Sequence, residues 1–583
     1  MVFDITKLVF ESEPMKKIII SIILITILAA CSPAPKPSVT PTPSLVPIVP
    51  SATSTSTPAP AVLWISPAVP PALRLAMQAA GIPTIDERDQ ATLHFDVTQS
   101  NDYQVSWIYA LVAPFPTLTD NVTVADLRGF WSGSSSGPFN GQPLLMAEST
   151  LAAFTALWGA PTQASVKIVS EDKLLDAAWA SIPSWAIIPF ESIQPRWKVL
   201  TVDGQSPIRK QFDTQKYPLR VAFALTGNSA QTLKIPASNY DPSKLTTVIM
   251  TGVTALWRGT AYTMEIKGIT YPGSSIRDIL READITHISN EVPFDKDCPF
   301  PNPGETSLAI LCSRPEYMDL LTDIGMDVVE LSGDHFDNRG VKAMFATLDL
   351  YKENGILYYG GGVNDVEGKK PLLVERNGNK LAFIGCNAKL DYPHATATIP
   401  GAAPCDFKYM TDQIKTLRAQ GYLPIATFQH YEYYSPEARP GQIKDFRMMA
   451  DAGAVVVSGS QAHSPQMMEF YNGAFIHYGL GNLFYDQMVY PLGNGRYTDR
   501  TRDEFIDRHV FYDGRYLGVE VLTAILMDYS RPQWMTEEQR RAFLSDYFYA
   551  SGWIPFSPTP IPAPTVTLTP LALPQPVNIT PTP

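Results

Sequence analysis

Short apolar runs alternate with amphipathic stretches between residues 62 and 530. Two of these runs, Pro424–Phe428 and Ala454–Ser458, are almost continuously apolar, which is typical of strands buried on both faces of a sheet. Each run is followed by a polar cluster that contains one of the chain's eight histidines. Because α/β proteins form their sites where parallel strands end, these two clusters are candidates for chemistry.

The runs between residues 245 and 530 predict one α/β domain. Its expected strands are Thr247–Gly252, Ile285–Ser289, Val328–Ser332, Ile356–Tyr359, Lys380–Gly385, Pro424–Phe428, Ala454–Ser458 and Ala474–Tyr478. Its expected helices lie between those strands, at Ser274–Glu282, Tyr317–Ile324, Val341–Asn354, Lys408–Ala419 and Gln442–Ala452. Strands that alternate with helices indicate an α/β fold.

Residues 62–235 predict a smaller α/β domain that precedes it. The expected strands are Val62–Ile65, Tyr109–Phe115, Trp185–Phe190 and Trp197–Val202, and the expected helices are Pro70–Ala80 and Thr123–Trp131. This segment, with ALVAPF at 110–115 and WAIIPF at 185–190, resembles the substrate domains of periplasmic binding proteins. The resemblance implies capture of a small ligand, and a structural spacer is the alternative.

The N-terminus predicts export. A basic start at residues 15–17 precedes the apolar run Ile18–Leu28, which is too short to span a bilayer comfortably. Residues 28–31, LAAC, match the bacterial lipobox, in which Cys31 receives the lipid. We therefore expect residues 1–31 to be a signal peptide and the protein to be anchored by lipid to the outer face of the cell membrane; a membrane-anchor helix is the alternative.

Composition adds two limits. A chain of 583 residues is too long for one core, and its net charge of −12 argues against nucleic-acid binding, which needs a basic face. Many of the 52 prolines lie in residues 32–61 and 555–583, which cannot bury a core. We expect the first segment to be an extended tether, and the second to be a disordered tail that serves as a spacer or contacts an envelope polymer.

Four cysteines remain after Cys31, namely Cys298, Cys312, Cys386 and Cys405. Outside the cytoplasm an even number favours disulfides, and the pairs nearest in sequence are 298–312 and 386–405. Zinc ligation and free buried thiols are the alternatives, although the sequence has no C-x-x-C.

Polar groups follow four of the expected strands. They are Asn290-Glu291, Asp334-His335, Gln429-His430, and Gln461 with His463. Carboxylate, amide and imidazole groups that converge at strand ends are what a divalent metal needs, and such an ion activates water and neutralises a phosphoester. Taken singly, each group also fits a turn or loop residue.

Five motifs contain or follow these groups: ISNEV at 288–292, GDHFDNRG at 333–340, QHYEYYSPE at 429–437, DAGAVVVSGSQAH at 451–463 and HYGLGNLFYDQ at 477–487. In this order the motifs resemble the CapA, or poly-γ-glutamate biosynthesis, family, whose domain is similar to the calcineurin-like metallophosphoesterases. The resemblance implies a metallophosphatase-like α/β domain with a divalent metal (Mn, Zn or Mg). The implied metal ligands are Glu291, Asp334, His430 and His463, the implied catalytic acid is His335, and the implied substrate-binding residues are Asn290, Tyr433, Gln461 and Asn482.

Two departures from the family pattern bear on mechanism. Val253 stands where the family has a metal-binding aspartate, and Gln461 stands where it has a histidine. A site altered in this way holds one ion better than two. Three hypotheses follow: an envelope lipoprotein for capsule or poly-γ-glutamate biosynthesis or export with membrane-embedded partners, an active metal-dependent hydrolase of a surface polymer or phosphoester, and a receptor that binds a solute or an anionic or glycan-like polymer.

Overall fold

The computed structural model describes residues 61–135, 137–139, 141–227, 234–305, 307, 310–487 and 499–555. The predicted signal peptide with Cys31 lies outside the described residues, as do residues 32–60 of the predicted tether and 556–583 of the predicted tail. In the described part, no helix is both long and apolar enough to span a bilayer. Both regions with predicted strands and helices are α/β, as the sequence pattern indicated.

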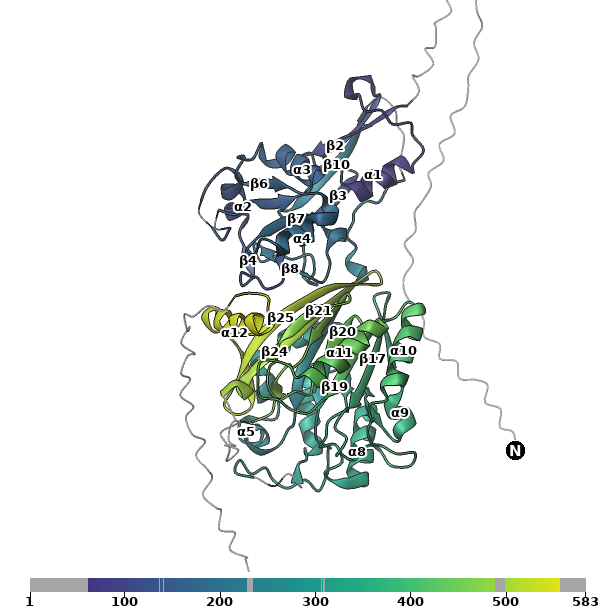
Figure 1. The fold of residues 1–583 in the computed structure, drawn as a ribbon, viewed down its shortest axis with the longest axis vertical. Coiled ribbons are helices and arrows are strands. Elements are labelled where there is room, and N and C mark those ends of the chain that lie inside the picture. The colour runs from purple at the N-terminus through teal and green to yellow at the C-terminus, as the bar shows by residue number, and fades with distance from the viewer. Residues whose placement is uncertain are drawn as a thin grey trace, which may run out of the picture. The chain divides into compact units, whose positions relative to one another are not determined.

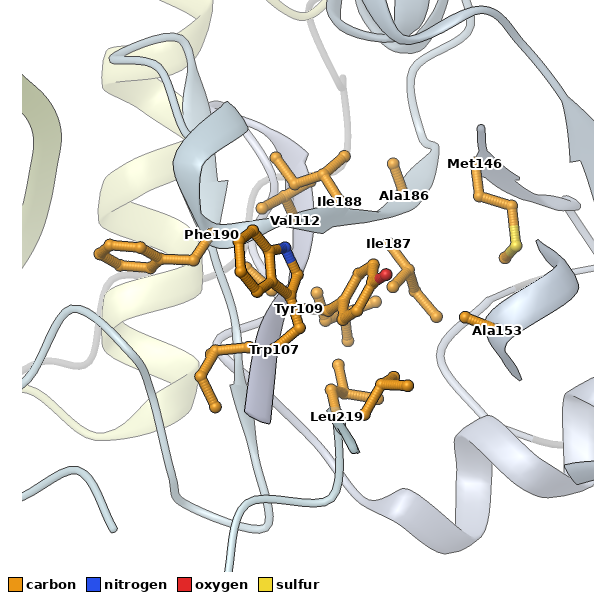
Figure 2. Packing of buried hydrophobic residues seen from close by; sticks show 14 of the residues in the cluster. Trp107, Tyr109, Val112, Met146, Ala153, Ala186, Ile187, Ile188, Phe190 and Leu219 are labelled. Atoms are coloured by element: carbon orange, nitrogen blue, oxygen red, sulfur yellow. The ribbon is translucent and has the colours of Figure 1, made fainter. Parts of the chain in front are cut away.

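The first region is built on a mixed eight-stranded sheet. Its strand order is β1 (Leu63–Ile65), β2 (Leu93–Thr98), β10 (Arg220–Gly227), β3 (Val105–Pro114), β7 (Trp185–Pro189), β5 (Leu144–Met146) and β6 (Val166–Ile168), with β8 (Trp197–Val199) paired to β3. A separate parallel pair is formed by β4 (Asn121–Val122) and β9 (Thr201–Val202). The helices are α1 (Pro71–Gln78), α2 (Val124–Trp131), α3 (Glu148–Trp158) and α4 (Leu174–Trp179). Figure 2 shows part of the core, where Tyr109 lies among apolar side chains that include Ile187 and Leu219.

The second region contains two larger sheets. One has the order β14 (Leu357–Tyr359), β13 (Val328–Glu330), β12 (Ile285–Asn290), β11 (Leu245–Thr254), β24 (Asp503–Tyr512), β25 (Arg515–Met527) and β26 (Arg531–Trp534), with β23 (Asn482–Phe484) paired to β11. The other has the order β16 (Leu372–Arg376), β17 (Asn379–Asn387), β19 (Leu423–Gln429), β20 (Val456–Ser458), β22 (Ala474–His477) and β21 (Met468–Tyr471). A small antiparallel pair is formed by β15 (Gly361–Gly362) and β18 (Gly401–Ala402).

Alternation along the strands divides the second region into four layers. Met250 of β11 and Phe383 of β17 lie in one shared core between the two sheets. The side chains next to them in each strand point away from that shared core. Ile249 lies in a second core, between the sheet of β11 and the helices on its outer face, and Ala382 lies in a third core, between the sheet of β17 and its own helices. The helices are α5 (Arg258–Lys267), α6 (Arg277–Glu282), α7 (Met318–Asp323), α8 (Gly340–Glu353), α9 (Asp365–Lys369), α10 (Phe407–Ala419), α11 (Pro440–Ala452) and α12 (Glu537–Ala550). Figure 1 shows α10 and α11 alongside β17, β19 and β20.

Local sequence explains where helices begin and end. Thr123 caps α2 in a capping box with Asp126, as its place before an amphipathic run predicts. Pro440 opens α11, where its missing N–H would have no intrahelical partner. The same helix ends at Gly453, whose φ of 110° favours glycine. These signals position the loops that follow the strands of the second sheet.

The expected strands and helices of the second region are all present, with ends that differ by a few residues. The sequence analysis did not identify α5, β15, α9, β16, β18, β21, β23, β24, β25, β26 and α12. The helix α12 lies beyond residue 530, the predicted domain end, and packs on β24, with the rings of Phe543 and Phe505 centred 4.6 Å apart. Cys298 is bonded to Cys312, and Cys386 to Cys405, the two pairs nearest in sequence.

Candidate metal centre

The candidate centre lies where the parallel strands of both second-region sheets end. Glu291 follows β12, and Asp334 and His335 follow β13, its parallel neighbour. These three residues offer ligand atoms that all lie within 4.8 Å of one another. Gly333 permits this approach, because a Cβ there would lie 2.9 Å from the Cα of Glu291. The fold thus brings together two carboxylates and an imidazole from two strand ends.

His463, which follows β20, forms a buried ion pair with Glu291. Its Nε2 lies 3.1 Å from Glu291 Oε1, and its Nδ1 lies 2.9 Å from Oδ1 of Asn482. Burial alone would lower the pKa of His463, but the Glu291 carboxylate outweighs burial and raises this pKa to about 9. Burial alone would raise the pKa of Glu291, but His463 outweighs it and lowers this pKa to about 2. Asn482 therefore orients the imidazolium, and Glu291 is held ionised.

Lys389, in the loop after β17, approaches the same group from the other sheet. Its Nζ contacts Oδ2 of Asp334 and Oε1 of Glu432, and its side chain is nearly buried. Gln429, the last residue of β19, donates to Asp334 Oδ1 at 3.3 Å and to Glu432 Oε1 at 3.1 Å. Burial would lower the pKa of Lys389, but Glu432 and Asp334 outweigh burial and raise it above the usual range. The centre therefore contains a protonated ammonium beside its carboxylates.

Two buried side chains at the centre are incompletely bonded. Within the described residues, Glu291 Oε2 and both amide atoms of Gln461 have no hydrogen-bond partner, and both side chains are fully buried. Gln461 Nε2 would lie 3.3 Å from a Cβ on Gly333, so this amide adjoins the group. Unpaired buried polar atoms are costly, and together with Asp334 and His335 they form the oxygen and nitrogen donor set that a divalent cation prefers. The residues present fit one ion, which Glu291, Asp334 and His335, with the adjoining Gln461, would hold.

The structure does not bring His430 into this group. Gln429 points toward Asp334, and the next side chain in an extended chain points the opposite way. His430 accordingly faces α11, where its Nε2 lies 3.3 Å from Asp445 Oδ2 and its ring is centred 6.5 Å from that of Phe446. His335, expected as an acid beside the metal, lies among the three clustered side chains that could hold an ion, and its role as an acid stays a prediction.

The four expected substrate-binding residues have different surroundings. Asn290 and Asn482 are fully buried, and their amides donate to the protein: Asn290 to Val292 O and Tyr351, and Asn482 to His463 O and Thr501 O. Tyr433 is partly exposed, with the guanidinium of Arg439 4.4 Å from its ring centre. Gln461 adjoins the ligand group, as described above.

Sequence reasoning missed two residues of the centre, Lys389 and Glu432, and gave the strand-end residue Gln429 no role. Gln429 and Glu432 flank His430 in the motif that drew attention to the histidine, and Lys389 follows β17 by two residues. A search near strand ends for every charged side chain, cations included, would have found Lys389 and Glu432.

The fold and the centre define an α/β protein with a candidate metal site at the ends of parallel strands. Residues 247–487 match the family described as "Bacterial capsule synthesis protein PGA_cap", so this part of the chain is distantly similar to CapA-type capsule proteins. The chain is 26% identical over 179 residues to the PGA biosynthesis protein CapA of Bacillus subtilis, which covers 30% of this chain and 47% of that protein. It is also 26% identical over 182 residues to the capsule biosynthesis protein CapA of Bacillus anthracis, covering 30% of this chain and 44% of that one. The chain thus spans less than half the length of each relative.

Solved structures give a partial likeness of fold. A 5′-nucleotidase precursor from Thermus thermophilus aligns with 53% of this chain and 58% of its own at 11% identity and a TM-score of 0.31. An ABC-type phosphate transport receptor from Vibrio cholerae aligns with 30% of this chain and 88% of its own, at 11% identity and a TM-score of 0.24.

Proposed function

We propose that this chain is an exported, lipid-anchored protein of the CapA type that takes part in the biosynthesis or export of a capsule polymer such as poly-γ-glutamate. The observation that carries the proposal is the clustering of Glu291, Asp334 and His335 inside the segment that matches the capsule-synthesis family. The lipobox at Cys31 supports the location, and membrane-embedded biosynthesis proteins are the expected partners.

The centre holds a single divalent cation in this proposal. Glu291, Asp334, His335 and Gln461 supply the donors, a mainly oxygen set with one imidazole that suits Mn²⁺ or Mg²⁺ and also accepts Zn²⁺. When bound, the ion supplies positive charge that attracts and neutralises an anionic group. His335 is partly exposed, so a ligand can reach its imidazole.

Aromatic side chains beside the centre suit a polymer. Tyr431 is 39% exposed, and Tyr433 is partly exposed under Arg439. Tyrosine offers contact area and a hydroxyl, and arginine pairs with carboxylate or phosphate. An anionic or glycan-like chain is therefore the ligand class that the surroundings favour.

Ion binding and polymer production test the proposal together. Soluble protein that begins at residue 32 is stripped with chelator, loaded with Mn²⁺ or Zn²⁺, and analysed for bound metal. We expect one ion per chain, and Glu291→Gln should weaken binding at least about tenfold, because it removes an anionic ligand. Glu375→Gln, at an exposed position of β16, is the matched control. In cells, Glu291→Gln should lower the surface polymer, and Glu375→Gln should not.

Two results would contradict the proposal: wild-type protein that binds no ion, or normal surface polymer in cells that lack the chain. Hydrolysis is the second candidate, because His335 combines an ionisable imidazole with partial exposure at the centre. Metal-dependent release of p-nitrophenol from bis(p-nitrophenyl) phosphate by wild-type protein, abolished in Glu291→Gln, would favour the hydrolase.

A further inference from the structure

Lys389 lies in a position where a metal ion would be expected. Its ammonium contacts a carboxylate oxygen of Asp334 and one of Glu432, and its side chain is 9% exposed. Asp334 follows a strand of one sheet and Glu432 follows a strand of the other, so the ammonium of Lys389 connects the two sheets at the centre. A buried cation between two carboxylates has the charge environment of a bound ion.

Asp334 is shared between this ammonium and the ligand group. One of its oxygens is within 4.8 Å of the ligand atoms of Glu291 and His335, and its Oδ2 contacts Lys389. A carboxylate placed between two cation positions is the arrangement of a bridging ligand in two-metal sites. Lys389 therefore fills the second of two adjacent cation positions.

The donors around the ammonium form a nearly complete second site. Besides Asp334 and Glu432, the fully buried Gln429 contributes an amide whose Oε1 has no hydrogen-bond partner among the described residues. Two carboxylates and an amide oxygen can coordinate a hard divalent cation once the lysine is absent. With Lys389 in place, its ammonium already neutralises part of the negative charge of these two carboxylates.

The loop that carries Lys389 is fixed at both ends. Asn387, which is buried, accepts from the N–H of Lys389 at 2.8 Å and donates to Ser332 O at 3.0 Å, so it joins the β17 and β13 ends. The Cys386–Cys405 disulfide closes the loop, and the N–H of Cys405 donates to Asn387 O. The position of the ammonium is therefore built into the fold.

We propose that Lys389 is a tethered cation that takes the place of a second metal ion and limits the centre to one ion. The inference rests on the proposed one-ion centre. A divalent cation beside a fixed ammonium is repelled strongly in a partly buried site, so the second position stays closed to metals. An anionic ligand would then meet one exchangeable ion and one permanent ammonium.

Metal analysis of two Lys389 variants tests the inference. Lys389→Met keeps the length and removes the charge, Lys389→Arg keeps the charge, and Lys408→Met, which removes an exposed lysine paired with Asp412, is the control. Each full-length protein is loaded with Mn²⁺ or Zn²⁺, and bound metal is measured by native mass spectrometry and by titration. We expect two ions in Lys389→Met, or one bound at least about tenfold more tightly, and wild-type behaviour in Lys389→Arg and Lys408→Met.

The outcomes separate the two proposals. One ion of unchanged affinity in both wild type and Lys389→Met would overturn the tethered-cation inference and leave the one-ion centre standing. No ion in wild type but one in Lys389→Met would overturn the one-ion centre, and with it the inference that Lys389 limits the centre to one ion. Loss of the ion in a folded Lys389→Met protein, or no ion in either protein, would overturn the inference. If Lys389→Met does not fold, Glu432→Gln is the second test, because it lowers the negative charge around the second position. This variant is predicted to bind the same single ion as wild type. Loss of that ion would count against the inference.

Discussion

Removal of the Cys386–Cys405 disulfide should destabilise the protein by about 3 kcal/mol. The bond joins residues 19 apart in sequence, and the chain-entropy model for a loop of that length gives about 11 cal/mol/K, or about 3 kcal/mol at 25 °C. Cys386 is buried at the end of β17, and the loop that the bond closes carries Lys389. Cys386→Ala with Cys405→Ala therefore removes a constraint on the unfolded chain and one end of the support for the ammonium.

Denaturant unfolding and hydrogen exchange together check this expectation. The free energy of unfolding should fall by about 3 kcal/mol, and amides of residues 388–404 should exchange faster than in wild type. The matched variant, Cys298→Ala with Cys312→Ala, opens a loop of similar length, 14 residues, and should cost a similar free energy without faster exchange at 388–404. A loss below about 1 kcal/mol, or equal exchange at 388–404 in both variants, would refute the reasoning.

Two further substitutions probe buried ionisable side chains outside the ligand group. Glu504 of β24 is fully buried, both its carboxylate oxygens lack a hydrogen-bond partner in the described part of the chain, and burial raises its pKa well above the ordinary value. The folded state thus keeps a proton on Glu504 that the unfolded chain releases, so the free energy of unfolding falls as pH rises above about 4.5. Denaturant unfolding at pH 5 and pH 8 should show a smaller fall in Glu504→Gln than in wild type. An equal fall in the two proteins would contradict this expectation. The buried Arg258 lies 3.2 Å from Asp486 Oδ1 and donates to Asp486 O at 2.9 Å. Arg258→Met leaves that carboxylate uncompensated and should cost about 3–5 kcal/mol by denaturant unfolding, and a loss under about 1 kcal/mol would count against a structural ion pair.

The fold could be predicted from the sequence where burial is two-sided. Runs such as Pro424–Phe428 are apolar on both faces because helices cover one side of the sheet and a second sheet covers the other, and they were recognised as strands. The long strand β24, DEFIDRHVFY, was missed, because it is buried on both faces and its buried residues include Glu504, Asp507 and His509. Polar residues inside the sandwich hide the strand pattern on which the prediction depends.

The centre could be predicted as a location but not as a set of contacts. Strand ends identified Glu291, Asp334, His335 and His463, because the ends of parallel strands meet in any α/β sheet. Successive side chains of an extended chain point to opposite sides, so a shift of one residue reverses the direction of a side chain at a strand end. For this reason Gln429 points to the centre and His430 points to α11. Lys389 could not be inferred from a search for metal ligands, since a lysine has no lone pair to give when protonated.

A buried carboxylate outside the ligand group explains how the strand ends stay aligned. Glu330, the last residue of β13, accepts hydrogen bonds from Ser289 Oγ at 2.8 Å and Ser332 Oγ at 2.5 Å, and it also contacts Ser460 Oγ. Each serine stands one or two residues before a member of the centre, on a segment from either sheet. Glu330 thus joins three backbone segments, whereas Glu291 Oε2 has no partner among the described residues. Glu330 thus fixes the backbone, and Glu291 keeps an oxygen available for a ligand. Such a separation of roles is expected of a centre whose geometry is set before its ligand binds.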